Sequence, residues 1–231
     1  MCGRYFADFT VDELKAVFKG PDLLGDFEPS YNVAPTDSMP IVRLEDGAAA
    51  LAGARWGLVP SWAEDTRVGY RGLNARAETV HRTRMFRDAF TSSRCLVLAS
   101  GFYEWLPPRQ RGEGKQPYAF SLSSGKRLLA FAGLWARRGE TDTFTIVTTE
   151  ANGLVGQVHE RMPVILAPRR WRDWISAETP TSELHRLLGP CPDGFLTAHP
   201  VDDAVGNVRA RGPELMTPIG PELQVPPQQG A

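Results

Sequence analysis

Three side chains in this sequence could take part in catalysis, one as a nucleophile and two in proton transfer. The candidate nucleophile is the thiol of Cys2. Once the initiator methionine is removed, residue 2 carries an α-amine and a thiol on neighbouring carbons. The usual pKa values, about 7.7–8.0 for the amine and about 8.5 for the thiol, leave a reactive fraction of each near neutral pH. A nucleophile at residue 2 is therefore the first hypothesis, and a cysteine in a frayed chain end is the alternative.

Glu104 and His159 are candidate proton-transfer groups. Glu104 stands among aromatic residues in GFYEW, at the end of an apolar stretch. Burial there raises the pKa of a carboxyl group toward the range of acid–base catalysis. His159, in QVHERMP, directly precedes a predicted strand. The alternatives are a glutamate paired with an arginine and a structural or exposed histidine.

A tract between residues 67 and 94 holds seven arginines and no lysine, against two acidic residues. A guanidinium group can donate two parallel hydrogen bonds to phosphate oxygens, so the tract suggests phosphate recognition. The alternative is a basic surface exposed to solvent. Asn74 and Arg76 lie on the same side if their segment is extended. The amide of Asn74 and the guanidinium of Arg76 would together orient a bound sugar–phosphate. Trp56 and Trp62 offer base-stacking surface or ordinary core packing.

Other chemistries lack their motifs. The chain has no GxxxxGK[ST], GxGxxG or GxSxG, and HERMP lacks the second histidine of a zinc HExxH site. Three widely spaced cysteines form neither a disulfide framework nor a CxxC pair, so we expect no metal and no cofactor. With 42% hydrophobic residues, net charge −1 and no long apolar run or signal pattern, we expect a cytoplasmic protein without membrane contact.

The sequence around these residues predicts many strands and few helices. A helix is expected over residues 10–21, where Thr10 and Glu13 form a capping box and Gly20-Pro21 ends the apolar stripe. Further helices are expected over 82–90, 169–176 and 181–189, with one or two helical turns over 152–159. Strands are expected over 39–44, 49–60, 95–106, 116–122, 128–136, 143–151, 162–167 and 195–201, with a turn at 45–47.

These elements predict an α+β fold, because strands outnumber helices and do not alternate regularly with them. We expect a curved, barrel-like, mostly antiparallel sheet flanked by short helices, with an antiparallel meander between residues 95 and 151. No Gly/Ser-rich linker interrupts the chain, which predicts a single domain over 1–216. The Pro-rich polar tail, 217–231, is expected to be disordered.

A series of short motifs, in a fixed order from residue 2 to about 200, resembles the SOS response-associated peptidase (SRAP) family of abasic-site processing proteins. The motifs are CGRY, YNVAP, RWGLVPSW, LNARAET, RMFRDAF, RCLVLASGFYEW, FAGLW, TFTIVTTEAN and VHERMPVIL. The resemblance implies a single α+β domain of the SRAP fold that binds single-stranded DNA. It also implies a covalent crosslink to abasic sites, in which residue 2 captures the ring-opened aldehyde as a thiazolidine.

The resemblance also implies roles for individual residues. Cys2 would be the nucleophile, Asn74 would hold the amine or a sugar oxygen, and Glu104 and His159 would move protons. Phosphate contacts are implied at Arg4, Arg76, Arg161 and Arg84, and base contacts at Trp62, Pro40, Met85 and Phe86. The resemblance further implies lyase activity, self-removal of Met1 and a monomeric state. It also implies a bacterial cytoplasmic protein that associates with the nucleoid when bound to DNA.

Two alternative functions stay open on the residues alone. MCG also opens glutamine amidotransferases with an N-terminal nucleophile, and Asn152-Gly153 could supply their oxyanion-hole pair. No other part of that pattern is convincing. A non-catalytic module for single-stranded DNA would use the arginines and aromatic residues without needing Cys2.

Overall fold

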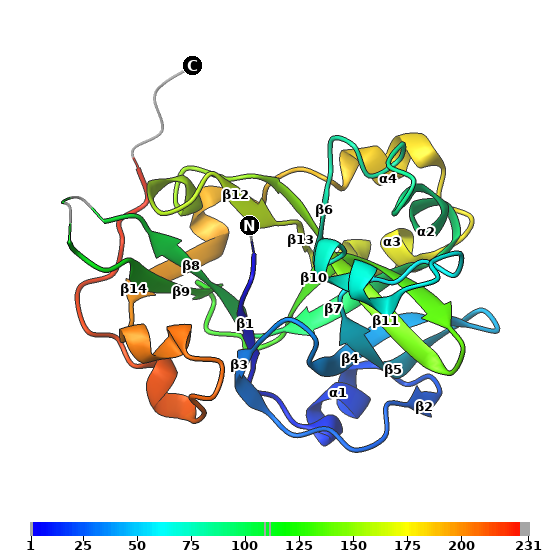
Figure 1. Ribbon diagram of the computed structural model, residues 1–231, viewed down its shortest axis with the longest axis horizontal. Helices are drawn as coiled ribbons and strands as arrows, with labels where there is room; N and C mark the ends of the chain where they lie inside the picture. The colour runs from blue at the N-terminus through cyan, green and yellow to red at the C-terminus, as the bar shows by residue number, and fades with distance from the viewer. Residues whose placement is uncertain (1, 109, 111, 227–231) are drawn as a thin grey trace.

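The computed structural model has the α+β arrangement predicted from the sequence (Figure 1). It describes residues 2–108, 110 and 112–226. Within these residues the strands form two sheets, one of nine strands and one of five. None of the helices found there is long and apolar enough to cross a membrane.

The larger sheet curves into a barrel. It contains β2 (Asp22–Leu23), β4 (Ser38–Glu45), β5 (Ala48–Trp56), β6 (Asn74–Arg76), β7 (Arg94–Ala99), β10 (Leu129–Arg138), β11 (Thr141–Glu150), β12 (Arg161–Pro163) and β13 (Ile165–Leu166). The order β11-β10-β7-β4-β5 is antiparallel, and parallel pairing of Thr143 with Arg55 and Phe144 with Trp56 closes it. The short β6 and β12 lie on opposite edges of β11, because both pair with it at Thr148. The predicted barrel-like sheet is confirmed.

The smaller sheet holds the N-terminal strand in its interior. Its order is β14 (Leu196–Pro200), β9 (Gln116–Leu122), β8 (Gly101–Leu106), β1 (Tyr5–Ala7) and β3 (Ser30–Val33), all antiparallel. Tyr5 pairs with Phe102 on one side and with Val33 on the other. The residues that precede β1 are therefore anchored by two neighbouring strands.

Aromatic packing joins the two sheets into one core. The buried ring of Tyr5 in β1 lies 5.2 Å from Trp56 in β5 and 5.9 Å from Phe131 in β10, centroid to centroid. Each such side chain contributes roughly 1.5–3 kcal/mol when it leaves water. The strand that carries the N-terminus is thus packed against the barrel wall, and its position is fixed by the core.

Short helices cover the sheets, namely α1 (Val11–Val17), α2 (Arg87–Ser92), α3 (Trp171–Ile175) and α4 (Thr181–Arg186). The predicted capping box of Thr10 and Glu13 is present at the start of α1. The helix expected over 82–90 begins only at Arg87, because turns hydrogen-bonded to Thr79 and Thr83 precede it. Short 3-10 turns occupy Thr66–Arg71, Val155–Gln157, Pro168–Arg170, Asp193–Phe195, Asp203–Gly206 and Pro213–Met216.

The continuous strand expected over 95–106 is divided between the two sheets. β7 ends at Ala99 in the barrel and β8 begins at Gly101 in the smaller sheet, while the N–H of Ser100 donates to Phe6 O. A Cβ atom at Gly101 would lie 2.2 Å from Phe120 O, so the crossing requires glycine. The predicted four-strand meander is therefore wrong, since β9 and β10 belong to different sheets.

Residues 217–226, part of the segment 217–231 whose composition predicts disorder, run beside β14. The N–H of Ile219 donates to Pro200 O at 3.0 Å, and that of Leu223 to Ala198 O at 2.8 Å. Leu223 also packs against the core. The edge of the sheet supplies these backbone partners whatever the side-chain composition of the segment. Residues 227–231 lie outside the described residues.

Candidate active site

Cys2 lies three residues before the start of β1, and its side chain is fully buried. The side-chain amide of Asn74, the first residue of β6, donates a hydrogen bond to Cys2 O at 2.8 Å. Burial, reinforced by the negative charge of Glu104, raises the pKa of the Cys2 thiol well above its usual range. The structure thus differs from the reactive thiol fraction expected from sequence: the sulfur stays protonated and needs a proton acceptor to react.

Glu104 supplies a carboxyl group beside the N-terminal segment. The pairing of β1 with β8 continues beyond Tyr5, because the N–H of Tyr103 donates to Arg4 O at 3.0 Å. Glu104 is the next residue along β8, and 3% of it is exposed. Burial raises the pKa of its carboxyl group to about 7, in the predicted direction. At neutral pH this group can either hold a proton or release it.

His159 faces the same region from the segment that leads into β12. Its Nδ1 accepts a hydrogen bond from the backbone N–H of Arg161 at 2.9 Å. Burial lowers the pKa of the imidazole, so the ring is neutral at physiological pH. A neutral ring has one nitrogen that donates and one that accepts.

Glu104 and His159 line a common hollow of about 470 Å³, which reaches Gly3, the residue after Cys2. Its walls are Gly3, Arg4, Glu104, Trp105, Lys115, His159 and Gly206. Sequence reasoning missed Trp105, Lys115 and Gly206. Trp105 follows Glu104 in the GFYEW motif and could have been included, whereas Lys115 lies in the segment before β9 and carries no local signal.

The arginines expected to bind phosphate have different environments. Arg76 is exposed on β6, and its side chain lies on the same side as Asn74 because Ala75 between them points into the core. Arg4 lines the hollow, where its Nη2 donates to Gly206 O at 3.5 Å. The guanidinium of Arg161 is held by both oxygens of Glu78, at 2.6 and 3.0 Å. Arg76 therefore has the most accessible charge of the three.

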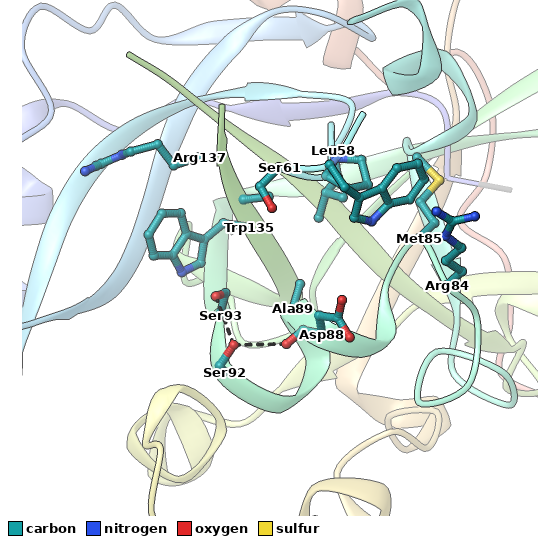
Figure 2. A pocket seen from close by; sticks show the side chains of 13 residues that line it. Leu58, Ser61, Arg84, Met85, Asp88, Ala89, Ser92, Ser93, Trp135 and Arg137 are labelled. Carbon is teal, nitrogen blue, oxygen red and sulfur yellow. Dashed lines mark hydrogen bonds between the residues drawn. The ribbon is translucent and has the colours of Figure 1, made fainter. Parts of the chain in front are cut away.

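A second pocket, of about 200 Å³, gathers three of the other predicted DNA-contact residues (Figure 2). Trp62 is 46% exposed, and the guanidinium carbon of Arg84 lies 4.5 Å from the centre of its ring. Met85 lies beside Arg84 (Figure 2). This pocket shares no lining residue with the hollow at His159.

Two predicted base-contact residues do not reach that surface. Pro40 is buried inside β4, where it pairs with Gly53 of β5. Phe86 is 7% exposed and packs in the core at the start of α2. Neither side chain has a free face for a base in this structure. Among the described residues, no group of three His, Cys, Asp or Glu side chains is arranged to hold a metal ion.

These features define a class of site in a single α+β domain: a buried thiol with an amide, a carboxyl group that titrates near neutrality and a neutral imidazole. Such a set suits covalent chemistry at sulfur or at the neighbouring amine, with proton transfer by the two titratable groups. A family model described as SOS response associated peptidase (SRAP) matches residues 1–208, and the chain belongs to this family.

Individual relatives match almost the whole chain. It is 35% identical over 226 residues to the abasic site processing protein YoqW of Bacillus subtilis, covering 94% of this chain and 99% of that protein. It is 31% identical to the abasic site processing protein YedK of Escherichia coli K12, covering 95% and 100%. A crystal structure of a Bacteroides thetaiotaomicron protein shares the fold, with a TM-score of 0.83 and 22% identity over 94% of this chain and 99% of that one.

Proposed function

We propose that this protein processes abasic sites in single-stranded DNA by capturing them as a covalent adduct of Cys2. Three observations support the proposal: Asn74 donates to Cys2 O, the charge of Glu104 acts on the Cys2 thiol, and Glu104 lines one hollow together with His159. The relatives named abasic site processing proteins supply the substrate class. One chain holds all four residues, so the proposal needs no second subunit.

The chemistry follows from the two nucleophiles of residue 2. A ring-opened abasic site presents an aldehyde at C1′. Once Met1 is removed, by the protein itself or by an aminopeptidase, the α-amine of Cys2 adds to this carbon and water leaves, which gives an imine. The thiol then adds to the imine carbon and its proton passes to nitrogen, closing a five-membered thiazolidine. Proximity of the thiol to the imine supplies several kcal/mol toward the second step.

The neighbouring groups match the proton transfers that these steps require. The buried thiol holds its proton, so ring closure needs an acceptor, and a carboxyl group with a pKa of about 7 can accept the proton and return it. Asn74 Oδ1 is buried and accepts no hydrogen bond within the described residues, so it can receive one from the amine. His159 would assist opening of the sugar and any β-elimination at the 3′ phosphate, the proposed lyase activity.

Binding of the strand would rest on charge and stacking. Arg76 and Arg4 would contact phosphates near the hollow, and Arg161 would do so while sharing its guanidinium with Glu78. Trp62, with Arg84 on its ring, offers an exposed face for a base. Binding should therefore weaken with salt, although the chain has a net charge of −1.

The test is incubation of the untagged protein with a single-stranded oligonucleotide that contains one abasic site. We expect an adduct that survives heating in denaturant, with the sugar on residue 2 and Met1 absent by mass spectrometry. Ammonia release from glutamine without an adduct would instead identify an amidotransferase. Binding that salt disrupts, again without an adduct, would identify a non-catalytic DNA-binding module.

Two variants separate aldehyde capture from simple thiol chemistry. Cys2→Ala keeps the amine, so borohydride should trap its imine although no heat-stable adduct forms. A residue retained ahead of Cys2 keeps the thiol but moves the amine, and it should also abolish the stable adduct. Cys191→Ala removes a different buried thiol and should leave the adduct unchanged. A stable adduct from the protein with the blocked amine would refute the mechanism.

A further inference from the structure

The side chain of Arg161 connects the two edges of β11. Its guanidinium donates two hydrogen bonds to the Glu78 carboxylate, from Nη1 to Oε1 at 2.6 Å and from Nη2 to Oε2 at 3.0 Å. Nη2 also donates to Thr148 O at 2.8 Å, and the N–H of Ala77 donates to the same oxygen. The side chain of Arg161 is 12% exposed, which reduces competition from water. A bidentate pair of this kind fixes orientation as well as distance.

This ion pair lies between two of the proposed catalytic residues. Glu78 follows β6, which begins with Asn74, while Arg161 begins β12, two residues after His159. β6 and β12 pair with β11 on opposite edges at Thr148. The Glu78–Arg161 pair thus bridges the strand that positions Asn74 and the segment that positions His159.

Two backbone groups of Arg161 contact His159 Nδ1 and bear on which ring nitrogen carries the proton: the N–H at 2.9 Å and the carbonyl oxygen at 3.2 Å. The N–H is the closer group and can only donate, and a hydrogen on Nδ1 would oppose it across 2.9 Å, so the shorter contact favours Nδ1 as the acceptor. In the neutral ring the proton must then reside on Nε2. His159 lines the hollow, and in this tautomer the ring would act on a ligand there as a hydrogen-bond donor.

We infer that Glu78 and Arg161 are positioning residues that hold neutral His159 as its Nε2–H tautomer. The consequence is a division of labour: His159 donates a hydrogen bond to the sugar or its phosphate, and Glu104 accepts the proton of the Cys2 thiol. Only this catalytic consequence rests on the proposed function. The tautomer and its dependence on Glu78 are properties of the free protein.

Long-range ¹H–¹⁵N NMR of protein labelled with ¹⁵N-histidine measures the tautomer directly. The chain has four histidines, and loss of one signal in His159→Gln assigns the ring. At about pH 8, where the ring is neutral, we expect an unprotonated Nδ1 and a protonated Nε2 in the unaltered protein. Glu78→Ala and Arg161→Lys should each shift the ring toward a mixture of tautomers. Glu78→Gln, which keeps the shape and one acceptor, should have a smaller effect.

Glu150→Gln is the matched control, because Glu150 is an exposed glutamate opposite Arg161 in the β11–β12 register. It removes the same charge and should leave the tautomer unchanged. An Nδ1–H tautomer in the unaltered protein overturns the inference without any variant. An unchanged tautomer in folded Glu78→Ala and Arg161→Lys overturns it as well.

Adduct formation supplies the second measurement. Displacement of His159 in Glu78→Ala should slow the adduct by up to about 10²-fold, while Glu150→Gln reacts at the unaltered rate. Equal rates in both variants would overturn the positioning role. If no protein forms an adduct but the tautomer responds to Glu78 as expected, the proposed function is wrong and the tautomer assignment stands.

Discussion

Replacing Glu104 by glutamine should make the protein more stable at alkaline pH, because the buried carboxyl group resists ionisation. Burial raises the pKa of Glu104 from 4.5 to about 7. Between these values the unfolded chain has released a proton that the folded protein still holds. The stability that this group contributes is therefore fully present below pH 4.5 and is lost as pH rises to about 7. Glutamine stays neutral and does not incur this loss.

The magnitude follows from the interval between the two pKa values. At about 1.4 kcal/mol per pH unit, the interval corresponds to about 3 kcal/mol of unfolding free energy. The stability of Glu104→Gln relative to the unaltered protein should therefore increase by about 3 kcal/mol between pH 4.5 and pH 8 and then level off. Glutamine has nearly the shape of glutamate, so packing changes contribute little to the dependence on pH.

Urea denaturation at a series of pH values, followed by tryptophan fluorescence, gives both free energies. Glu150→Gln, at an exposed position, should keep a constant difference from the unaltered protein over the same range. Curves for Glu104→Gln and the unaltered protein that stay parallel from pH 4.5 to pH 8 would refute a raised pKa at Glu104. The adduct rate of the unaltered protein should change near pH 7. Glu104→Gln should lose about 10²- to 10⁴-fold of that rate.

Two further predictions test charge and chain-end packing. Arg76→Ala should reduce the slope of log affinity against log salt for single-stranded DNA by about 0.7, since one phosphate contact is lost; an identical slope would remove Arg76 from the phosphate contacts. Deleting residues 217–231 should lower the unfolding free energy by about 2 kcal/mol, because the backbone hydrogen bonds of Ile219 and Leu223 and the apolar contact of Leu223 are lost. An unchanged urea midpoint would show that this segment adds nothing to stability.

Local features of the fold could be predicted because their causes are local. The capping box of Thr10 and Glu13 needs only residues one helical turn apart, and it forms as expected. The turn between β4 and β5 could also be predicted, because Asp-Gly favours a tight hairpin turn. In the structure Asp46 and Gly47 adopt the positive φ angles of such a turn, 50° and 80°. In each case the residue types that favour the structure are adjacent in the chain.

Assignment of strands to sheets could not be predicted, because it depends on partners far away in sequence. Nothing in the apolar run 95–106 marks Ser100 as the point where one sheet ends and another begins. That break is set by the N–H of Ser100 donating to Phe6 and by the close approach of Phe120 to Gly101. The same reason applies to residues 217–226, since their backbone partners on β14 have no signature in the composition of the segment.

The residues of the candidate site were found through their types and through the family motifs, but their environments came only from the structure. Sequence reasoning expected a raised pKa at Glu104, which the buried position explains. It did not foresee the complete burial of Cys2 or the ion pair of Arg161 with Glu78. Both depend on which strands adjoin β1 and β11, which is a property of the closed barrel.

The interior position of β1 also sets an order of events during synthesis. β1 leaves the ribosome first, yet it cannot take its place between β3 and β8 until β8, which ends at Leu106, has been made. At about 5–20 residues per second, that takes roughly 5–20 s. Throughout this interval residue 2 lacks the cover that β8 provides and is open to aminopeptidases, whereas in the finished fold its side chain is fully buried. The removal of Met1 that the proposed function requires would therefore either precede the insertion of β1 or be carried out by the finished site itself.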